Sequence, residues 1–381
     1  MTNSNLMCDA LVIGGGIGGV SIAFELAADR KVCLVESEST LAFHTTGRSA
    51  ATFVETYGNL PIRALTASSR SFFTSPSDLF EFPLASPRGV LHVTREQDDD
   101  VARKLFDEVR TLSTSAELVG GRDAERLNPL LRPGYTAFAV YEPDGMDLDV
   151  AELHQGYVRG LQRRGGVISR SAQVASATRD GAIWLITDSS GSQYRAPLVV
   201  NAAGAWCDDV ARLLGATPVG IRPLRRTIFT VLAIDEIGGE IPMTIDEARS
   251  FYIKPEKFQY LCSPGDETLQ PACDVQVDPL DVAIGLDLIN EATIMNARHV
   301  RASWAGLRSF VFDRTPVVGF DEEIAGLLWM AAQGGYGIQI APSLAKFAAS
   351  TVRGTPVPSE LLERGFQASA LSPARFKGLK D

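Results

Sequence analysis

The sequence contains few of the residues that bind metals or form disulfides. It has only five cysteines and four histidines in 381 residues. The cysteines are dispersed, none forms a CxxC pair, and no histidine lies at the spacing of a zinc site, so we predict no metal centre. An odd, scattered set of thiols is typical of buried cysteines in a reducing compartment.

The sequence also lacks an excess of positive charge. Lys and Arg number 36 against 46 Asp and Glu, which gives a net charge of −10. No segment is strongly basic, so we predict no nucleic-acid partner. Apolar residues make up 45% and charged residues 22%, which excludes a disordered chain, a collagen and a disulfide scaffold. At roughly 100–200 residues per domain, the length suggests two domains or one large one.

No apolar run is long enough to cross a membrane. Residues 10–24 are uncharged but rich in glycine, and Glu25 and Asp29 end the run short of the about 20 apolar residues that a transmembrane helix needs. No basic residue precedes the run, as it would in a signal peptide. We therefore expect a cytoplasmic location, which leaves room for peripheral attachment to the inner membrane, and no transmembrane segment.

The amino-terminal region has the pattern of a dinucleotide-binding βαβ unit. Residues 10–13 predict a buried strand, residues 21–28 a helix, and residues 31–35 a second buried strand. The glycines of a GxGxxG motif follow the first strand: Gly14, Gly16 and Gly19. In this motif the first glycine permits a tight turn, the second lets a pyrophosphate approach the backbone, and the third lets the helix pack on the strand. The helix amino terminus then offers free N–H groups to the phosphates.

An acidic residue, Glu36, ends the second strand. Its carboxylate can accept hydrogen bonds from both ribose hydroxyls, and its charge would repel a 2′-phosphate, so NADP is disfavoured. This order of strand, glycines, helix, strand and acid indicates a dinucleotide site far more specifically than GxGxxG alone. A glycine-rich turn that binds nothing would explain neither the acid nor the spacing.

Two further segments favour FAD over NAD. Residues 43–51 form a small, hydroxyl-rich loop where an NAD enzyme would normally continue with another strand and helix. Near the carboxyl end, residues 327–330 predict a strand, residues 333–339 a glycine-rich loop, and residues 340–352 a helix with Pro342 in its first turn. The amino terminus of that helix would stabilise negative charge on a reduced isoalloxazine ring. Two such units at opposite ends of one chain suit FAD, which is long enough to span both.

Seven stretches in a fixed order extend this pattern along the chain: 12–19, 46–51, 63–67, 154–157, 200–207, 304–310 and 331–339. Together they resemble the FAD-dependent D-amino-acid oxidase (DAO) family, which includes glycine oxidase, sarcosine oxidase and D-amino-acid dehydrogenases. Within the family the stretches are most similar to the bacterial D-arginine dehydrogenases. The resemblance implies an α/β fold, with a Rossmann-like FAD-binding domain of the glutathione-reductase type and a mixed α+β substrate domain built on an antiparallel sheet.

The resemblance also implies that both domains are discontinuous. The FAD-binding domain is expected over residues 5–80, 148–221 and 304–375, and the substrate domain over residues 81–147 and 222–303. Local patterns agree with this division. Asp149 is placed to cap a helix over 150–164, a further helix is expected near 98–112, and residues 228–231 and 251–254 alternate as in an antiparallel sheet.

Residues at both ends and in the middle of the chain match the FAD contacts of the family. Arg48 would bind phosphate, Ser49 would bring a hydroxyl near flavin N5, and Val174 would meet the adenine. The full expected set is Gly14, Gly16, Ile17, Gly19, Glu36, Ser37, Thr46, Arg48, Ser49, Ala50, Ala51, Val174, Ala203, Gly204, Gly334, Gly335, Tyr336, Gly337, Ile338 and Gln339.

An amino-acid oxidase must hold the substrate carboxylate, and a buried carboxylate needs a cation. Arg308 is the best candidate, because its neighbours are apolar and a guanidinium grips a carboxylate bidentately. A second cation comes from Arg225 or Arg226, of which only one can face the site, because successive side chains of a strand point to opposite faces. The resemblance points to Arg226.

The resemblance places five more residues in the catalytic site: Tyr57, Tyr252, Gly306, Gly335 and Thr52. The two tyrosine hydroxyls would bond the carboxylate or order a water near the amine, and core tyrosines with satisfied hydroxyls are the alternative interpretation. The two glycines would offer backbone carbonyls to the substrate amine.

The sequence departs from the D-arginine enzymes where they bind the cationic side chain. Their glutamate falls here at or near Val90, and a histidine and a threonine of their pocket correspond to Thr52 and Val54. Without a carboxylate a substrate guanidinium would be buried unpaired, so we predict a neutral or apolar D-amino acid. Glu55 could supply the charge if its loop shifts, which leaves a cationic substrate open.

The predicted reaction is FAD-dependent oxidative deamination of a D-amino acid. Hydride transfer from Cα to flavin N5 would give an imino acid, which hydrolyses to a 2-oxo acid and ammonia. An oxidase or dehydrogenase of a secondary amine (sarcosine, glycine or an opine-like compound) stays open, because its substrates share the arginine-held carboxylate. A flavoprotein without turnover and an NAD-dependent dehydrogenase are further alternatives. The sequence does not indicate the electron acceptor, whether a quinone, a dye or oxygen, although Arg226 or Lys254 could place a cation near the flavin as in the family's oxidases.

Overall fold

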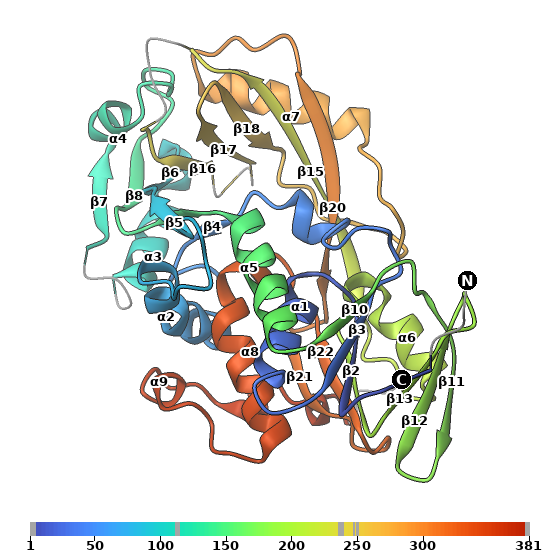
Figure 1. Ribbon diagram of the computed structural model, residues 1–381. Helices are drawn as coiled ribbons and strands as arrows, with labels where there is room; N and C mark the ends of the chain where they lie inside the picture. The colour runs from blue at the N-terminus through green and yellow to red at the C-terminus, as the bar shows by residue number, and fades with distance from the viewer. Residues whose placement is uncertain (1–4, 111–114, 235–239, 247, 249–250, 378–381) are drawn as a thin grey trace.

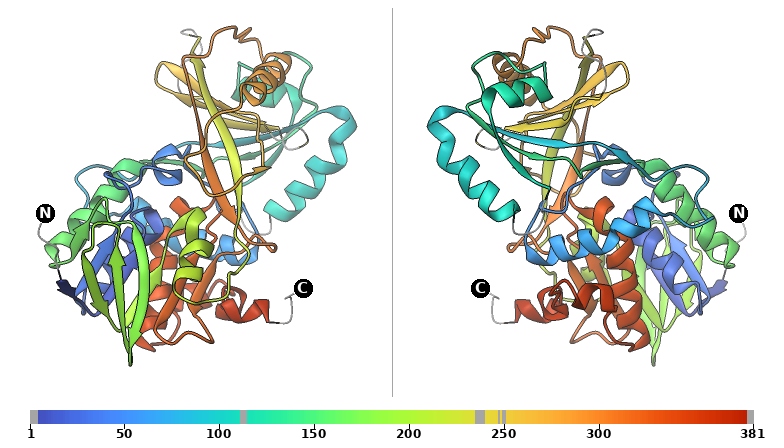
Figure 2. Two further views of the ribbon diagram at one scale, coloured as in Figure 1. Left: turned by 90° about the vertical axis from the view of Figure 1, so that its right-hand side faces the viewer. Right: turned by 90° about the vertical axis from the view of Figure 1, so that its left-hand side faces the viewer.

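Two large β-sheets organise the fold, one above the other in Figure 1. The computed structural model of the protein describes residues 5–110, 115–234, 240–246, 248 and 251–377. The lower sheet is covered by helices from both ends and from the middle of the chain. The upper sheet is built from two internal segments, and its long strands β15 and β20 run down toward the helices of the lower layer (Figure 2).

The lower sheet has six strands in the order β10-β3-β2-β14-β22-β21, and all neighbours are parallel except β21 and β22. Its strands are β2 (Ala10–Ile13), β3 (Val32–Val35), β10 (Val167–Ser169), β14 (Leu198–Asn201), β21 (Val317–Phe320) and β22 (Leu327–Ala331). The four central strands are buried along their whole length, as expected for parallel strands covered on both faces. The strands predicted at 10–13, 31–35 and 327–330 are confirmed to within a residue.

Helices pack on one face of this sheet, and a smaller sheet covers the other. The helices next to the sheet are α1 (Ile17–Leu26), α5 (Val150–Arg163) and α8 (Gly337–Arg353), while α2 (Leu60–Thr74) packs on α8 and α9 (Ser359–Leu362) on α2. The smaller sheet runs β1-β13-β12-β11, with β1 (Asn5–Met7), β11 (Val174–Asp180), β12 (Ile183–Asp188) and β13 (Gln193–Ala196). Helix α1 lies against both α5 and α8, so the two ends of the chain meet in one core.

Two helices begin earlier than predicted. Helix α1 starts at Ile17 rather than residue 21, because Gly18 and Gly19 are themselves helical, while Gly16 is the extended N-cap residue. A Cβ on Gly19 would lie 1.8 Å from the carbonyl oxygen of Gly14, so only glycine allows this close approach of helix and strand. Helix α8 starts at Gly337 rather than 340, and Pro342 therefore falls in its second turn and not in its first, which corrects the prediction.

In the part of the chain that the structure describes, the upper sheet has nine strands. Eight follow the order β19-β15-β18-β17-β16-β6-β8-β7, β20 pairs with β15, and all pairs are antiparallel except β16 with β6. The strands are β6 (Val90–Thr94), β7 (Glu117–Gly120), β8 (Phe138–Glu142), β15 (Arg222–Leu232), β16 (Met243–Asp246), β17 (Phe251–Glu256), β18 (Gln259–Ser263), β19 (Thr268–Leu269) and β20 (Ala302–Phe310). The antiparallel strands predicted at 228–231 and 251–254 are confirmed.

Further elements lie around the two large sheets. They are β4 (Thr52–Phe53), β5 (Ala85–Pro87) and β9 (Met146–Leu148) in a small sheet, the helices α3 (Asp99–Val109), α4 (Gly121–Leu127), α6 (Cys207–Leu213) and α7 (Pro279–Ala292), and the 3-10 turns η1 (Thr45–Arg48), η2 (Glu96–Asp98), η3 (Gly204–Trp206), η4 (Ala368–Ala370) and η5 (Pro373–Phe376). Helix α3 confirms the helix predicted near 98–112, whose last residues, 111 and 112, lie outside the described residues. The Asp149 carboxylate caps α5 by accepting the Glu152 N–H at 2.8 Å, as predicted.

The fold matches the predicted class, an α/β dinucleotide-binding layer with a second, mixed α+β layer. The predicted boundary at residue 304 falls inside the continuous strand β20, so residues 304–310 pair within the upper sheet. The division of the chain into two domains stays a prediction. No helix in the described part of the chain is both long and apolar enough to span a membrane.

Candidate active site

Two adjoining cavities connect the layers. The smaller, of about 360 Å³, opens at the carboxyl ends of β2 and β3, and the larger, of about 520 Å³, lies between the two large sheets. Residues that line both cavities mark their junction: Gly16, Thr45, Thr46, Ala202 and Gly204. The carboxyl ends of parallel strands are the usual ligand site of open α/β sheets. An elongated ligand can therefore pass from one cavity into the other.

The smaller cavity is lined by Glu36, which was predicted to bind the ribose, and by the glycine turn. Gly14 has φ +111°, and a Cβ there would lie 2.4 Å from the Ala202 carbonyl oxygen, so the turn requires glycine. The Glu36 carboxylate accepts the Gly15 N–H at 2.6 Å, which fixes it beside the turn. Other expected cofactor residues that line this cavity are Gly16, Ser37, Thr46, Val174, Ala203 and Gly204.

A histidine that was not predicted as a site residue supports this turn. The buried ring of His154, on α5, has Nε2 at 2.9 Å from the Gly15 carbonyl oxygen. Burial lowers the pKa of His154, and this effect outweighs the opposite effects of the Gly15 carbonyl and of Glu36. The neutral ring is therefore the favoured form beside the glycine turn. His154 stood in one of the matched stretches, but no motif indicated its partner.

The neutral His154 makes stability depend on pH. In the unfolded chain the ring takes up a proton near pH 6.5, whereas in the folded protein its pKa is lower. The contribution of the neutral ring is therefore fully present above pH 6.5 and is lost as the pH falls through that value toward the folded pKa. We expect His154→Gln, which keeps a donor for the carbonyl, to lose less stability than the wild type between about pH 7.5 and 5.5. Urea unfolding at both pH values measures the difference, and equal losses would contradict it.

The first turn of α1 lies at the junction of the cavities. Gly16, Ile17 and Gly18 line the larger cavity, and the Ile17 N–H donates to the Thr46 hydroxyl at 3.0 Å. Free N–H groups and the positive end of the helix dipole make such a turn a phosphate site. Gly19 does not line either cavity. It contributes through the packing of α1 on β2.

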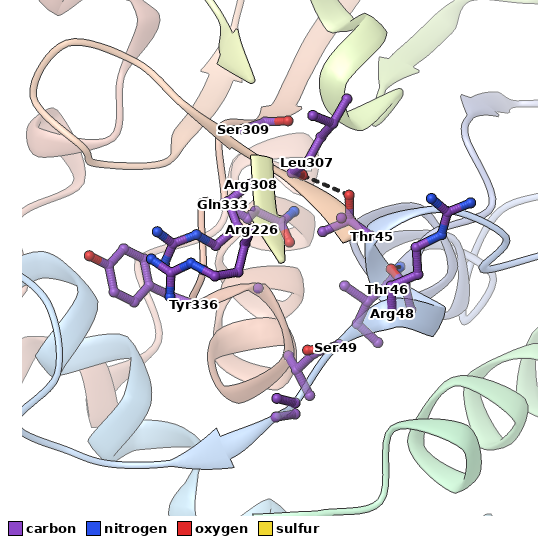
Figure 3. A pocket seen from close by; sticks show the side chains of 18 of the residues that line it. Thr45, Thr46, Arg48, Ser49, Arg226, Leu307, Arg308, Ser309, Gln333 and Tyr336 are labelled. Atoms are coloured by element: carbon purple, nitrogen blue, oxygen red, sulfur yellow. Dashed lines mark hydrogen bonds between the residues drawn. The ribbon is translucent and has the colours of Figure 1, made fainter. Parts of the chain in front are cut away.

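Arg48 lies differently from its predicted phosphate contact. It lines the larger cavity, as do Ser49, Ala50 and Ala51. Its guanidinium donates to the Ala305 carbonyl at 3.0 Å and pairs with Asp274 at 2.6 Å, so it ties the loop to β20. Figure 3 shows this side chain directed away from Arg226 and Arg308. The guanidinium is thus bonded within the protein, and the phosphate contact stays a prediction.

The second glycine loop forms another wall of the larger cavity. Gly334, Gly335, Tyr336, Gly337 and Ile338 all line it, so the first turn of α8 opens into the cavity. The Gly334 N–H donates to the Ser309 carbonyl at 2.8 Å, which holds the loop against β20. Gln339 differs from the prediction, because its side chain is buried between the Val54 N–H (3.1 Å) and the Thr66 hydroxyl (2.9 Å) and does not line the cavity.

Strand register decides which arginine faces the cavity. In the pairing of β15 with β20, Arg226 lies opposite Gly306 and Leu224 opposite Arg308. Arg226 and Arg308 therefore share one face, and both line the larger cavity, where Figure 3 shows them side by side. Arg225 points to the other face and pairs with Asp278 and Asp281 of the α7 segment.

The remaining predicted catalytic residues share the larger cavity with this arginine pair, and Thr52 lies beside Met243, to whose sulfur its hydroxyl donates at 3.4 Å. Tyr57, Tyr252, Gly306, Gly335 and Thr52 all line the larger cavity. The Tyr57 hydroxyl lies 3.5 Å from Arg308 Nη1. A Cβ on Gly335 would lie 3.0 Å from the same nitrogen, so a side chain there would press on the guanidinium. The structure thus brings the predicted residues together, while their catalytic roles stay predictions.

The far end of the larger cavity is largely apolar. Its wall consists of Val54, Ile228, Met243 and Ile245, with His92 beyond. The His92 ring is bonded to buried Glu142 at 2.9 Å, which also accepts the Thr56 hydroxyl. Glu55, which could have replaced a missing charge, pairs with Arg70 at 2.5 Å and does not line the cavity.

Lys254 and Val90 also lie outside the cavity. Lys254 pairs with Asp147 and Glu256, each at 3.3 Å. It therefore offers no cation to the cavity, although the sequence left that possibility open. Val90 is fully buried behind the cavity wall.

Sequence reasoning missed two charged residues at the polar end of the larger cavity, Glu267 and Arg314. Glu267 follows β18 and forms ion pairs with Arg308 and Arg314. Neither residue belongs to a motif, and their partners are distant in the sequence. Burial would raise the pKa of the Glu267 carboxyl, but the hydrogen bond with Arg314 and the surrounding guanidiniums outweigh burial and hold it below its usual value. Glu267 is therefore ionised.

Chemically, this arrangement can hold a small carboxylate beside a large planar ligand. The guanidiniums supply charge-assisted donors, and the glycine loop leaves room for close approach. The cavity is lined by apolar groups with a few convergent polar ones, as is typical of small-molecule sites. In the described part of the chain, no cluster of three or more His, Cys, Asp or Glu is arranged to hold a metal ion.

Known proteins share this architecture. The family model described as DAO, FAD dependent oxidoreductase, matches residues 9–351. Glycine oxidase of Bacillus licheniformis is 23% identical over 93% of this chain and 95% of its own length. Dimethylglycine dehydrogenase of Mus musculus is 23% identical over 93% of this chain, which spans only 43% of that enzyme. The crystal structure of glycine oxidase from Geobacillus kaustophilus has a TM-score of 0.85 at 20% identity, covering 98% of this chain and 100% of that one, and this likeness shows the fold.

Proposed function

Because the chain belongs to the DAO family of FAD-dependent oxidoreductases, we propose that it oxidises the carbon–nitrogen bond of a small amine that carries a carboxylate, with a neutral or apolar D-amino acid favoured. The observation that carries this proposal is the shared face of Arg226 and Arg308 at the polar end of the larger cavity. Two guanidiniums within one cavity are suited to an anionic group.

The chain's own residues fit FAD. The joined cavities give room for an elongated cofactor, and the positive φ of Gly14 forms a cradle that a side chain would fill. Glu36 and the first turn of α1 would hold the ribose and the pyrophosphate, and the loops at residues 49–51 and 334–338 would flank the flavin ring. When bound, FAD accepts the hydride that leaves the substrate Cα.

Each polar residue would then act on one part of the substrate. Arg308, with the Tyr57 hydroxyl beside it, would grip the carboxylate and so fix the orientation of Cα. The backbone carbonyls of Gly306 and Gly335 would accept hydrogen bonds from the amine. Loss of an amine proton and of the Cα hydride leaves an imino acid, and water then releases a 2-oxo acid and ammonia.

The apolar far wall supports a neutral or apolar side chain. Glu55 is paired with Arg70. The glutamate of the D-arginine enzymes is replaced here by Val90, which is apolar and buried. Neither position therefore places a carboxylate in the cavity. A cationic side chain would leave water without a counter-ion there. The similarity to the D-arginine dehydrogenases therefore stays a prediction about the branch of the family to which the chain belongs. It does not extend to a cationic substrate.

A second candidate is the oxidation of glycine or of an N-methylated glycine. It is favoured by the similarity to glycine oxidase and to dimethylglycine dehydrogenase. These compounds share the carboxylate and differ at the side chain and at the amine. The apolar wall contributes little to binding a substrate without a side chain, so we rank this candidate second.

Anaerobic mixing of the holoenzyme with a substrate panel distinguishes the two candidates. The panel contains D-alanine, D-leucine, D-arginine, glycine, sarcosine and dimethylglycine, and loss of the oxidised flavin absorbance reports reduction. We expect D-leucine or D-alanine to reduce the flavin faster than D-arginine and the glycine derivatives. Faster reduction by sarcosine or dimethylglycine would favour the second candidate. If dithionite bleaches the flavin and no amine does, the proposed function is wrong.

A further inference from the structure

One carboxylate of the chain itself lies at the polar end of the larger cavity. Glu267 Oε1 is 2.8 Å from Arg314 Nη2 and 3.5 Å from Arg226 Nη2, and it is also bonded to Arg308 Nη2. Its other oxygen, Oε2, accepts from Arg314 Nη1 at 3.0 Å. Three guanidiniums therefore converge on a single side-chain carboxylate.

This is the contact set that a substrate carboxylate would need. The Arg308 side chain is only 10% exposed, and Glu267 occupies its Nη2, whereas its Nε has no partner. A substrate carboxylate that binds Arg308 through two hydrogen bonds needs this Nη2 and therefore competes with Glu267 for it. Arg226 is held by the Gly265 and Asp266 carbonyls, and its pKa is lowered by burial and by the nearby Arg308 charge. A negative group between these two cations is therefore strongly favoured, whether it comes from the chain or from a ligand.

We infer that Glu267 is a built-in competitor for the substrate carboxylate and that Arg314 receives Glu267 when the substrate displaces it from Arg308. The pair would set the affinity for carboxylate substrates and exclude amines that bring no anionic group. The inference rests on the proposed function, because it takes Arg308 to be the substrate's anchor. Glu267 is thus assigned as a specificity-determining residue rather than a catalytic one.

Arg314 is built to hold Glu267 without Arg308. It makes two parallel hydrogen bonds to the carboxylate, the geometry that binds a guanidinium most strongly to an acid. Its guanidinium carbon lies 4.0 Å from the ring centroid of Phe310, a cation–π contact that fixes its position. The residue also has φ +57°, a left-handed conformation that is uncommon without glycine and that clusters at functional sites.

The position of the pair at the cavity edge makes displacement feasible. The side chains of Glu267 and Arg314 are 35% and 43% exposed, whereas Arg308 is nearly buried. Glu267 follows the irregular segment Pro264 to Asp266, in which Gly265 has φ +72°. Because Arg314 bonds to both carboxylate oxygens, Glu267 would keep a counter-ion when its bond to Arg308 is broken.

Binding of acetate to the holoenzyme tests this inference without turnover. Isothermal titration calorimetry would give the dissociation constants of the wild type and of Glu267→Asp, Glu267→Gln and Arg314→Gln. Glu267→Asp keeps the negative charge, but its side chain is one methylene shorter. It therefore distinguishes the loss of competition for Arg308 from the loss of a negative charge near the cavity. We expect both Glu267 variants to bind acetate about tenfold more tightly, because one charged hydrogen bond no longer has to be broken.

Arg314→Gln should shift binding in the opposite direction. Without Arg314, Glu267 keeps only Arg308 and the more distant Arg226 as counter-ions, so it should hold Arg308 more tightly and acetate should bind several-fold more weakly. Glu363→Gln, which changes an exposed acid on the α9 segment, is the control for net charge and should leave the constant unchanged. Flavin content and thermal unfolding of each variant confirm that the fold is intact.

The outcomes separate this inference from the proposed function. Unchanged or weaker acetate binding by Glu267→Asp, or no acetate binding by any variant, would overturn the competitor role. If the wild-type flavin is still reduced by a D-amino acid, the proposed function stands even so. If no amine reduces the flavin but acetate binds more tightly to both Glu267 variants, the competition is upheld and the proposed substrate class is wrong.

Discussion

Replacing Arg308 by glutamine is expected to lower kcat/KM for the carboxylate substrate by about 10²-fold to 4 × 10³-fold. Removing one partner of a buried ion pair costs roughly 3–5 kcal/mol, and each 1.4 kcal/mol is a factor of ten. Arg308 is nearly buried and faces the larger cavity, so water cannot replace it well. Steady-state kinetics with a dye acceptor would measure the loss, with flavin content as the check that the cofactor stays bound.

A lysine at the same position is the matched control. Arg308→Lys keeps the positive charge but loses the planar fork that holds a carboxylate through two bonds. We expect an intermediate loss, seen mainly in KM, and a kcat decrease that reflects poorer orientation of Cα. Full activity of Arg308→Gln with normal flavin content would remove Arg308 from the substrate site.

The second large effect is expected from Gly19→Ala. The added methyl group would lie 1.8 Å from the Gly14 carbonyl oxygen, so α1 would have to move away from the β2 turn. That movement displaces the N–H groups of the first turn of α1 from the junction of the two cavities. We expect the purified variant to retain little or no FAD and to unfold at a lower temperature, because overpacking itself costs about 1–3 kcal/mol.

Gly120→Ala is the control for a glycine without close neighbours. Its φ is −77°, and a Cβ there would meet no atom within 4 Å. Its flavin content and unfolding temperature should match the wild type. The measurement is the ratio of visible flavin absorbance to protein, together with thermal unfolding. A fully flavin-loaded Gly19→Ala would contradict the role given to the close packing of α1 and β2.

Features that follow from local backbone rules were predictable from the sequence. The buried strand before Gly14, the acid at Glu36 and the cap at Asp149 depend on residues near in sequence, and the structure has the strand and the cap where predicted. Successive side chains of a strand point to opposite faces, so only one of Arg225 and Arg226 could face the site. The family resemblance indicated that it is Arg226. The structure has Arg226 on the cavity side.

Contacts between distant polar side chains could not be predicted. Arg48 bonds to Asp274, and Gln339 bonds to Thr66, because tertiary packing brings these distant segments together. Local sequence patterns do not predict such contacts. Glu267 and Arg314 were missed for the same reason, since an acid in an irregular loop is usually a solvated surface residue. The early start of α1 was missed because glycine is a poor helix former, and here packing overrides its propensity.

The most direct test of the account is an anaerobic crystal structure of the holoenzyme with a bound D-amino acid. The account requires FAD to extend through both cavities, the substrate carboxylate to lie on Arg308, and the side chain to point toward Val54 and Met243. It further requires Glu267 to have left Arg308 and to remain on Arg314. A substrate whose carboxylate lies elsewhere, with the Arg308–Glu267 pair intact, would contradict the account.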